Sequence, residues 1–303
     1  MTTPAVHISE VRKSFGPSFA LGPLSLDIPK GAICALVGPN GAGKTTLMNL
    51  MMGIGRADEG DTLLLGHDVR TAEVEVKRRT AFVSPDLSYR AWGTVGRALD
   101  FVSAFYRDWN ESRSVNLQYQ LGLQRSARID ALSFGERVKL SVLMALSRDA
   151  DLLLLDEPTA GLDPLARQLL FTELLRFMQN EERTIVISSH QLVELERFAD
   201  HVAILNEGQL VTFGAIPALL ERYVQIDALV KSERVAPGAG LRVLARDGDR
   251  ARMLVDRRAV ELRALSLMGV EVIRESALTL EELFVALLER GDAVRWRPKM
   301  AAA

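Results

Sequence analysis

The residues best suited to chemistry lie in a glycine-rich run at 38–46, Gly-Pro-Asn-Gly-Ala-Gly-Lys-Thr-Thr. Its three glycines lack a Cβ atom, so the backbone can turn its N–H groups inward around an anion. Lys44 can reach the β- and γ-phosphates of a nucleotide, and Thr45 can offer its hydroxyl to Mg²⁺. The run therefore predicts a phosphate-binding loop, with these nucleotide-contacting candidates: Gly38, Pro39, Asn40, Gly41, Ala42, Gly43, Lys44, Thr45 and Thr46.

Two adjacent carboxylates, Asp156 and Glu157, follow the run of four leucines at 152–155. Such a run is typical of a strand buried on both faces of a parallel sheet, and ligands bind at the carboxyl ends of these strands. Asp156 can hold Mg²⁺ through its water shell, and Glu157 can polarise an attacking water molecule. Together with the loop, the pair favours hydrolysis of a nucleoside triphosphate.

Three further sites have two interpretations each. Ser133 and Gly135 precede the apolar run 138–147, where a serine can simply cap a helix or can form, with a glycine N–H and the helix dipole, a second anion site. His190 ends the apolar run 184–189 and can cap a helix or donate a hydrogen bond to a γ-phosphate. Phe15 can stack on a base or belong to the core.

The elements around these residues indicate an α/β protein. The apolar run 32–37 predicts a strand before the loop, and 47–52 predicts a helix after it. Strands that alternate with helices predict a mostly parallel sheet with helices on both faces. Short strands at 6–13, 24–28 and 61–65 form a separate opening sheet, and residues 87–150 are assigned to a helical subdomain.

The C-terminal part contains no recognisable chemistry. We place the boundary at residue 219, which leaves 220–303 as a small α+β accessory domain with a flexible tail. Strands are predicted at 224–232, 241–246, 251–256 and 270–274, and helices at 258–268 and 279–290. A turn at 237–240 joins two of the strands, and the basic tail contains Arg295, Arg297 and Lys299.

Composition narrows the class of protein. The chain has 303 residues, 48% of them apolar, and a net charge of −2, so there is no basic field that would attract nucleic acid. Its single cysteine, Cys34, excludes a disulfide framework within the chain. No apolar run approaches the roughly 20 residues of a membrane helix, and no signal pattern is seen. We expect a protein of the cytoplasm; if a membrane is involved, another chain crosses it.

Seven of the 18 aromatic residues fall between positions 82 and 109. Phe101, Phe105 and Trp109 are spaced at i, i+4 and i+8, which predicts one helix face that belongs to a local core. Tyr89 and Trp92 precede that helix in an irregular stretch. They fit an exposed contact surface and a local core equally well.

The motifs occur in an order and spacing that resembles the ATP-binding cassette (ABC) ATPases over residues 4–215. These motifs are GPNGAGKTT at 38–46, LSFGE at 132–136, LLLLDEP at 152–158, AGLD at 160–163 and SSH at 188–190. The stretches FVSPD and FVSAFYRDWN resemble those of exporter-type ATPase subunits, which drive a separate membrane protein. The resemblance implies a P-loop NTPase (RecA-like) fold: a mostly parallel sheet flanked by helices, an antiparallel β subdomain and a helical subdomain.

The resemblance also implies roles for individual residues. ATP and Mg²⁺ are the expected cofactors, with Thr45 and Asp156 serving the metal. Glu157 matches the catalytic base, and His190 matches the residue that positions the γ-phosphate and water. Further matches are Phe15 to the adenine-stacking aromatic, Asp163 to the aspartate that communicates across the dimer, and Ser133 and Gly135 to the signature that completes the partner subunit's ATP site.

The implied partners are a second ABC ATPase subunit, identical or related, and a separate transmembrane permease, with no nucleic acid. The chain would attach peripherally to the cytoplasmic face of the cell membrane. Two positions depart from the family. Pro85 or Asp86 stands where a glutamine is usual, which makes Asp86 a further candidate metal ligand, and Phe134 replaces a signature glycine.

Three other functions compete with this interpretation. Soluble ABC proteins of DNA repair or the ribosome usually have coiled-coil or zinc insertions or two cassettes, and neither these nor a basic stripe is visible here. A non-hydrolysing regulatory subunit is disfavoured by the intact Glu157 and His190, but the altered glutamine position leaves it open. A kinase or GTPase is the weakest alternative, because no guanine-reading Asn-Lys-x-Asp run occurs.

Overall fold

The computed structural model describes residues 3–189, 192–230 and 240–288. The chain forms two compact units. The first comprises residues 1–191 and 197–213, and the second comprises residues 192–196 and 214–303. The predicted domain boundary at residue 219 stays a prediction.

A six-stranded sheet with the order β10-β9-β3-β8-β7-β6 forms the centre of the first unit. Parallel pairs join β3 to β8 and β9, and β7 to β6 and β8. Every residue of the three strands β3, β7 and β8 is buried, as expected for central strands of a covered parallel sheet. The predicted parallel sheet is thus confirmed, with these strands: β3 (Ile33–Val37), β6 (Thr80–Val83), β7 (Leu152–Leu155), β8 (Thr184–Ser188), β9 (His201–Asn206) and β10 (Gln209–Ala215).

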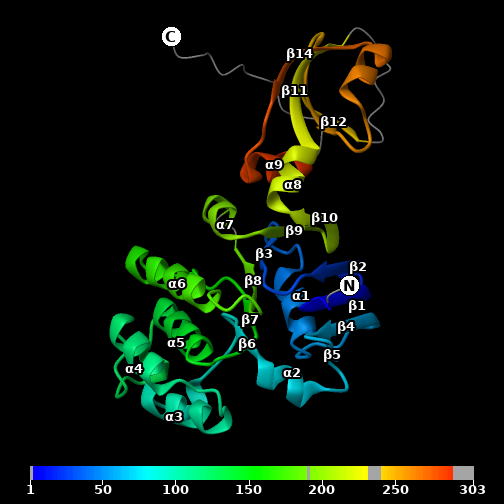
Figure 1. Ribbon diagram of the computed structural model, residues 1–303. Coiled ribbons are helices and arrows are strands. Elements are labelled where there is room, and N and C mark those ends of the chain that lie inside the picture. Colours follow the sequence, from blue (N-terminus) through cyan, green and yellow to red (C-terminus); the bar gives the residue numbers. More distant parts are fainter. Residues whose placement is uncertain (1–2, 190–191, 231–239, 289–303) are drawn as a thin grey trace. The chain divides into compact units, whose positions relative to one another are not determined.

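A second, antiparallel sheet has the order β2-β1-β4-β5, with β1 (Val6–Ser14), β2 (Ala20–Ile28), β4 (Glu59–Leu64) and β5 (His67–Asp68). Helix α1 (Lys44–Met51) lies between the two sheets (Figure 1). One core cluster joins all three layers; it includes Ile8 and Leu24 of the antiparallel sheet, Met48 and Met51 of α1, and Leu154 and Val186 of the parallel sheet. This packing fixes the start of α1 against the ends of the parallel strands.

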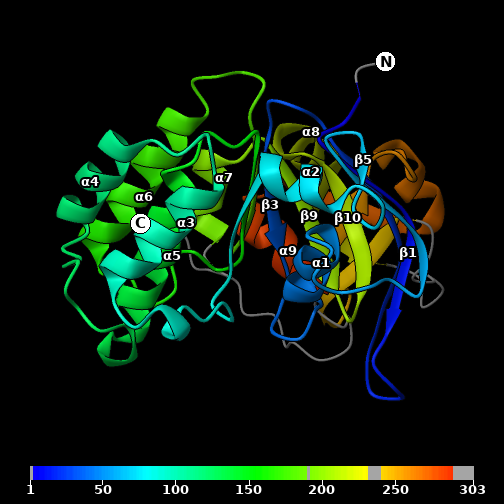
Figure 2. The same ribbon diagram turned by 90° about the horizontal axis from the view of Figure 1, so that it is seen from below.

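Helices α3 to α6 gather on the side of the parallel sheet away from the antiparallel sheet (Figures 1 and 2). Helix α5 contacts α3, α4 and α6. Helix α4 ends at Gln120, and the chain then turns at Gly122 with φ of 69°. The bounds of this group are α2 (Glu73–Arg79), η1 (Arg90–Trp92), α3 (Val95–Phe105), α4 (Glu111–Gln120), η2 (Ile129–Ala131), α5 (Phe134–Leu146) and α6 (Pro164–Phe177).

The predicted aromatic core on one helix face is wrong. Helix α3 ends at Phe105, so Trp109 is not part of it. Trp109 instead forms an isolated antiparallel β-bridge with Arg148. Phe101 and Phe105 are 45% and 68% exposed. The reason is that α3 buries its first turn, where Val95, Gly96, Ala98 and Leu99 lie, whereas both phenylalanines lie in its second half.

The second unit is built on an antiparallel sheet with the order β12-β13-β11-β14. The predicted helix at 258–268 is instead a 3₁₀ segment, η3 (Leu262–Met268), and Leu265 of that segment joins the core of this unit. The predicted turn at 237–240 and the basic tail fall largely or wholly outside the described residues. The other elements are α7 (Leu192–Phe198), α8 (Ile216–Arg222), β11 (Tyr223–Val230), β12 (Leu241–Asp247), β13 (Arg250–Asp256), β14 (Val270–Ser276) and α9 (Leu280–Leu288).

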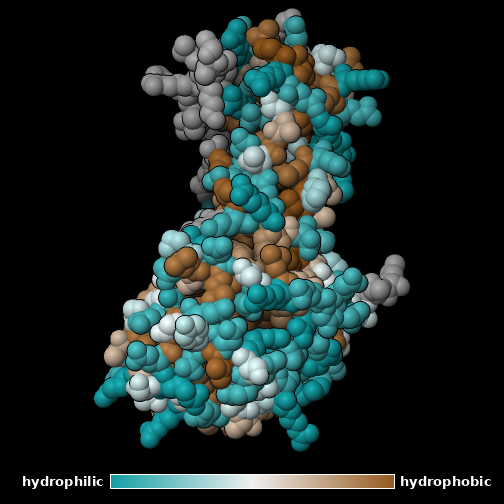
Figure 3. Space-filling view, turned by 60° about the vertical axis from the view of Figure 1, so that its left-hand side comes forward, coloured by the Kyte–Doolittle hydropathy of each residue, from teal (hydrophilic) through white to brown (hydrophobic). Residues whose placement is uncertain are grey.

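Apolar side chains on the face seen in Figure 3 are interspersed with polar ones over the first unit. Among the residues that the structure describes, no helix is both long enough and apolar enough to cross a membrane.

Candidate functional site

The glycine-rich run forms a tight loop between β3 and α1. Its glycines are needed for their backbone conformation at some positions and for lack of space at others. Gly41 and Gly43 have φ of 81° and 103°, in the region that favours glycine. A Cβ at Gly38 would lie 2.4 Å from the Leu205 carbonyl oxygen. Because the amides in the first turn of α1 have no acceptor within the helix, the loop offers N–H groups and a positive helix end to an anion.

Lys44, at the start of α1, is only 7% exposed. Its Nζ donates hydrogen bonds to the carbonyl oxygens of Gly38 at 2.7 Å and Pro39 at 3.2 Å, which holds the ammonium across the loop. Burial lowers the pKa of Lys44, while the nearby Glu157 and Asp156 act in the opposite direction. The arrangement presents a point charge where a phosphate would enter the loop.

Asp156 is 1% exposed and is bonded on both carboxylate oxygens. Thr45 Oγ1 donates to its Oδ2 at 2.7 Å, and Ser188 Oγ donates to its Oδ1 at 2.6 Å. The fold therefore brings the two predicted metal ligands, Thr45 and Asp156, into contact.

These oxygen ligands fit Mg²⁺, which prefers oxygen and usually keeps waters and substrate phosphates in its shell. The described residues contain no group of three or more His, Cys, Asp or Glu side chains able to hold a metal on their own. An ion at Thr45 and Asp156 would accordingly complete its shell with phosphate oxygens and water.

A small cavity of about 10 Å³ lies beside the carboxylate pair Asp156 and Glu157. Its volume is roughly the room for one water molecule. Phe134 lines the cavity, and so does Pro85, one of the two residues that can stand at the usual glutamine position; the other, Asp86, is not among its lining residues. The complete lining is Val83, Ser84, Pro85, Leu87, Phe134, Arg137, Val138, Ser141, Asp156 and Glu157.

The residues of the LSFGE run begin helix α5 at the surface. Ser133 is the N-cap, and its Oγ and the Glu136 carboxylate each accept a hydrogen bond from the other's backbone amide. The helix-capping interpretation of Ser133 is thus confirmed. Ser133 itself is exposed, so its hydroxyl and the helix end remain accessible from outside the chain.

The AGLD loop packs directly on this helix start. A Cβ at Gly135 would lie 2.2 Å from the Gly161 carbonyl oxygen, and one at Gly161 would lie 2.7 Å from the Phe134 ring. Asp163 caps α6 (Pro164–Phe177) and pairs with Lys139 Nζ at 2.7 Å. The hydrogen bond from Lys139 lowers the pKa of Asp163 to about 2.

Phe15 lies beyond the end of β1 and is half exposed. Its ring centroid is 6.0 Å from that of Phe19 and 5.8 Å from Lys13 Nζ. Phe19 in turn reaches the phosphate loop, since its Cζ lies 3.2 Å from the Cβ position of Gly43. Phe15 is therefore an accessible aromatic face connected to the loop, while His190 lies outside the described residues.

Comparisons with known proteins agree with this geometry. A profile of the ABC transporter family matches residues 21–160. The chain is 31% identical over 239 residues to the Nod factor export ATP-binding protein I of Burkholderia orbicola (strain AU 1054), which covers 76% of this chain and 77% of that protein. The chain belongs to the ABC transporter family. It is an ATP-binding subunit that hydrolyses ATP, as the motifs predicted.

Other relatives extend the likeness. The protein of the same name from Mesorhizobium japonicum (strain LMG 29417 / CECT 9101 / MAFF 303099) is 30% identical over 311 residues, 95% of this chain and 88% of that protein. Among solved structures, the ATP-binding subunit of an ABC transporter aligns with a TM-score of 0.65 at 22% identity and covers 72% of this chain and 92% of that one. A bacterial Atm1-family ABC exporter with ATP bound aligns with a TM-score of 0.62 at 21% identity, over 73% of this chain and 40% of that one. These structures confirm the predicted P-loop fold.

Sequence reasoning missed one residue of this ABC subunit's site, Ser188, and one buried structural residue at the other end of the strands, Arg148. Ser188 was noted only as part of the SSH run, although its hydroxyl contacts both Asp156 and Glu157. Arg148 is 4% exposed and donates to the backbone oxygens of Arg78 at 2.5 Å and Thr80 at 2.9 Å, which anchors the start of β6. The signal for Arg148 was weak: a charged residue directly after an apolar helix.

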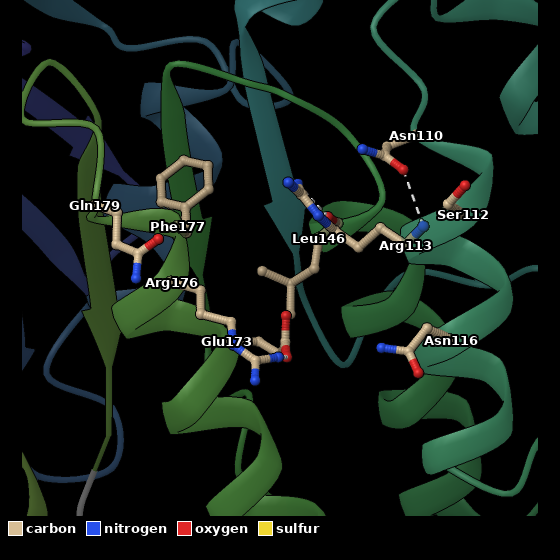
Figure 4. Close-up of a pocket in the computed structure, with 9 residues that line it drawn as sticks. All are labelled: Asn110, Ser112, Arg113, Asn116, Leu146, Glu173, Arg176, Phe177 and Gln179. Carbon is tan, nitrogen blue, oxygen red and sulfur yellow. Dashed lines mark hydrogen bonds and ion pairs between the residues drawn. The ribbon is translucent and has the colours of Figure 1, made fainter.

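A larger cavity of about 470 Å³ lies elsewhere in the first unit, between α4, α5 and α6 (Figure 4). Its lining is polar, with Glu173 paired to Arg176 and the Asn110 side chain accepting from the Arg113 amide. The cavity contains none of the predicted site residues. Its lining is Asn110, Ser112, Arg113, Asn116, Leu146, Glu173, Arg176, Phe177 and Gln179.

Proposed function

We propose that this ABC subunit hydrolyses ATP to power export through a separate transmembrane protein. The observation that carries the proposal is the convergence of Thr45, Asp156 and Glu157 at the mouth of the phosphate loop. Relatives named as export ATP-binding proteins support the direction of transport.

In this proposal, catalysis consists of positioning and charge stabilisation of the transferred phosphoryl group. The loop amides and Lys44 hold the phosphates, and Phe15 stacks on the adenine. Thr45 and Asp156 hold Mg²⁺, which supplies positive charge to the phosphate oxygens. Glu157 accepts a proton from the attacking water, and the cavity beside it has room for about one such molecule. His190 donates a hydrogen bond to the γ-phosphate.

A second cassette completes each site in this proposal. Ser133 and Gly135 stand at the exposed start of α5, where a helix end and its amides form an anion site. We assign them to the ATP of a second ABC subunit, either another copy or a related chain. The AGLD loop packs on this helix start. In this proposal, a movement of the helix start when the two subunits close on ATP is passed to Asp163 in that loop, and toward Glu157 of the same chain.

The transmembrane partner is proposed to dock on an aromatic surface formed by Tyr89, Trp92, Phe101 and Phe105. Their rings contact one another in sequence, with centroid distances of 5.5, 5.1 and 4.7 Å. Phe101 and Phe105 are 45% and 68% exposed, while Tyr89 and Trp92 are partly buried beside them. Exposed aromatic rings of this kind mark an interaction site. The chain would then sit at the cytoplasmic face of the membrane.

Site-specific photo-crosslinking in native membranes tests the proposed partner. A photoreactive residue at Phe105 is expected to attach to a protein with several membrane-spanning segments. The control position is Val74, which is 82% exposed on α2 (Glu73–Arg79). A Val74 probe that captures such a protein, with a Phe105 probe that captures none, would contradict the docking surface.

A further inference from the structure

Ser188 is the last residue of β8 (Thr184–Ser188) and is completely buried. The register of β7 against β8 pairs Leu155 with Ile187, so the next residue of each strand comes side by side. Ser188 Oγ consequently lies 2.6 Å from Asp156 Oδ1 and 2.8 Å from the amide nitrogen of Glu157. One hydroxyl contacts both members of the carboxylate pair.

The direction of these hydrogen bonds follows from the groups involved. The Glu157 amide can only donate, so Ser188 Oγ is its acceptor, and the single hydroxyl proton of Ser188 goes to the Asp156 carboxylate. The second bond has an ionised acceptor and is one of the stronger kind. Thr45 holds the other oxygen of Asp156 at 2.7 Å, so the chain of bonds runs from the phosphate-loop helix to the backbone of Glu157.

The backbone of Glu157 needs such support. Its φ is 46°, in the left-handed region that is unfavourable for a residue with a Cβ. A residue persists in such a conformation only where its surroundings fix it. At Glu157 the amide is held by Ser188, and the carbonyl oxygen accepts from the Ala160 amide at 3.0 Å.

We propose that Ser188 is a positioning residue for Glu157 in ATP hydrolysis. Ser188 Oγ accepts a hydrogen bond from the Glu157 amide and donates one to Asp156. These two bonds hold the backbone conformation that directs the Glu157 side chain toward the phosphates. The proposal rests on the proposed role of Glu157 as the base. It adds that the base is placed by a residue on a neighbouring strand, which acts through Asp156 and the backbone of Glu157.

The test compares Ser188→Ala with Ser188→Thr, which keeps the hydroxyl, in steady-state hydrolysis at saturating ATP and Mg²⁺. Ser188→Ala is expected to lower the rate roughly 10- to 100-fold, the size of effect known for small misplacements of a reacting group. ATP affinity should change by less than about threefold, because the loop contacts are untouched. Ser188→Thr should restore most of the rate.

Thr184→Ala is the matched control for a general loss of stability. Thr184 lies at the opposite end of the same strand, is equally buried, and accepts one backbone amide, that of Gly31 at 3.1 Å. It should lower the unfolding temperature without lowering the rate. A Thr184→Ala rate as low as that of Ser188→Ala, or a Ser188→Ala rate equal to the wild-type rate, would overturn the positioning role.

A double-variant cycle with Glu157→Gln separates the two proposals. If Ser188 acts through Glu157, Ser188→Ala should lower the residual rate of Glu157→Gln no further. An equal loss in both backgrounds would overturn the Ser188 proposal while the base assignment stands. Wild-type hydrolysis by Glu157→Gln would instead overturn the base assignment, and the Ser188 proposal with it.

Discussion

Two regions of the first unit differ in what they bury and what they expose, and in both the placement is energetically unfavourable. At the ends of β7 and β8 the structure buries polar groups, with Asp156 and Ser188 at 1% and 0% exposure. On α3 it exposes two large aromatic rings, those of Phe101 and Phe105, at 45% and 68% exposure. Burial of a charge without partners and exposure of a large apolar surface are both unfavourable, so each marks a place where function outweighs stability.

The difference indicates what each region does. The buried carboxylate is fully hydrogen-bonded and therefore fixed in place, which suits a site that must hold reacting atoms in one geometry. The exposed rings stack on one another but bury only part of their surface, which suits a surface that a second protein covers. Reaction and docking should accordingly respond to separate substitutions.

The largest expected effect comes from breaking the buried region at Lys44. Lys44→Ala removes the ammonium that spans the phosphate loop. Two charge-assisted hydrogen bonds to phosphate, at about 1.5 kcal/mol each, correspond to a loss of affinity of at least about 100-fold. Titration with a fluorescent nucleotide measures it. Lys77→Ala, in an exposed pair with Glu73 on α2, is the control, and comparable affinities for the two variants would contradict the role of Lys44.

A smaller effect on the protein itself is expected when the exposed region is broken. Phe105→Ser replaces a ring that is 68% exposed, so stability should change by roughly 0.5 kcal/mol or less and basal hydrolysis by less than about twofold. The fraction of the chain bound to native membranes should fall. Sedimentation of the membranes, with a hydrolysis assay on each fraction, tests this prediction. A reduced basal rate with unchanged membrane binding would contradict the assignment of docking to this surface.

The smallest expected effect concerns Asp163, an exposed carboxylate that contrasts with the buried Asp156. Its folded-state pKa of about 2 lies below its ordinary value of 3.8, because Lys139 donates to it. A lowered pKa stabilises the fold above pH 4, and the contribution is lost as the pH falls from about 4 toward 2. Urea unfolding over that range should show a weaker pH dependence for Lys139→Met. Identical slopes for the two proteins would show that the pair contributes nothing.

The sequence predicted the parts of the site that are set by local spacing. The loop at 38–46, the helix cap at Ser133 and the acidic strand end at Asp156 each depend on a few consecutive residues, and the fold brings them together. The role of Ser188 could not be predicted, because its partners are fixed by the register between two strands 32 residues apart. The exposure of Phe105 was missed because helical spacing identifies a face but not which side its neighbours cover.

The proposed mechanism of ATP hydrolysis depends most directly on Glu157. The decisive measurement is the turnover of purified Glu157→Gln beside its affinity for ATP in the presence of Mg²⁺. The account predicts that turnover falls by at least about 100-fold, as expected when a general base is lost, while ATP still binds with nearly unchanged affinity. A Glu157→Gln subunit that hydrolyses ATP at the wild-type rate would contradict it.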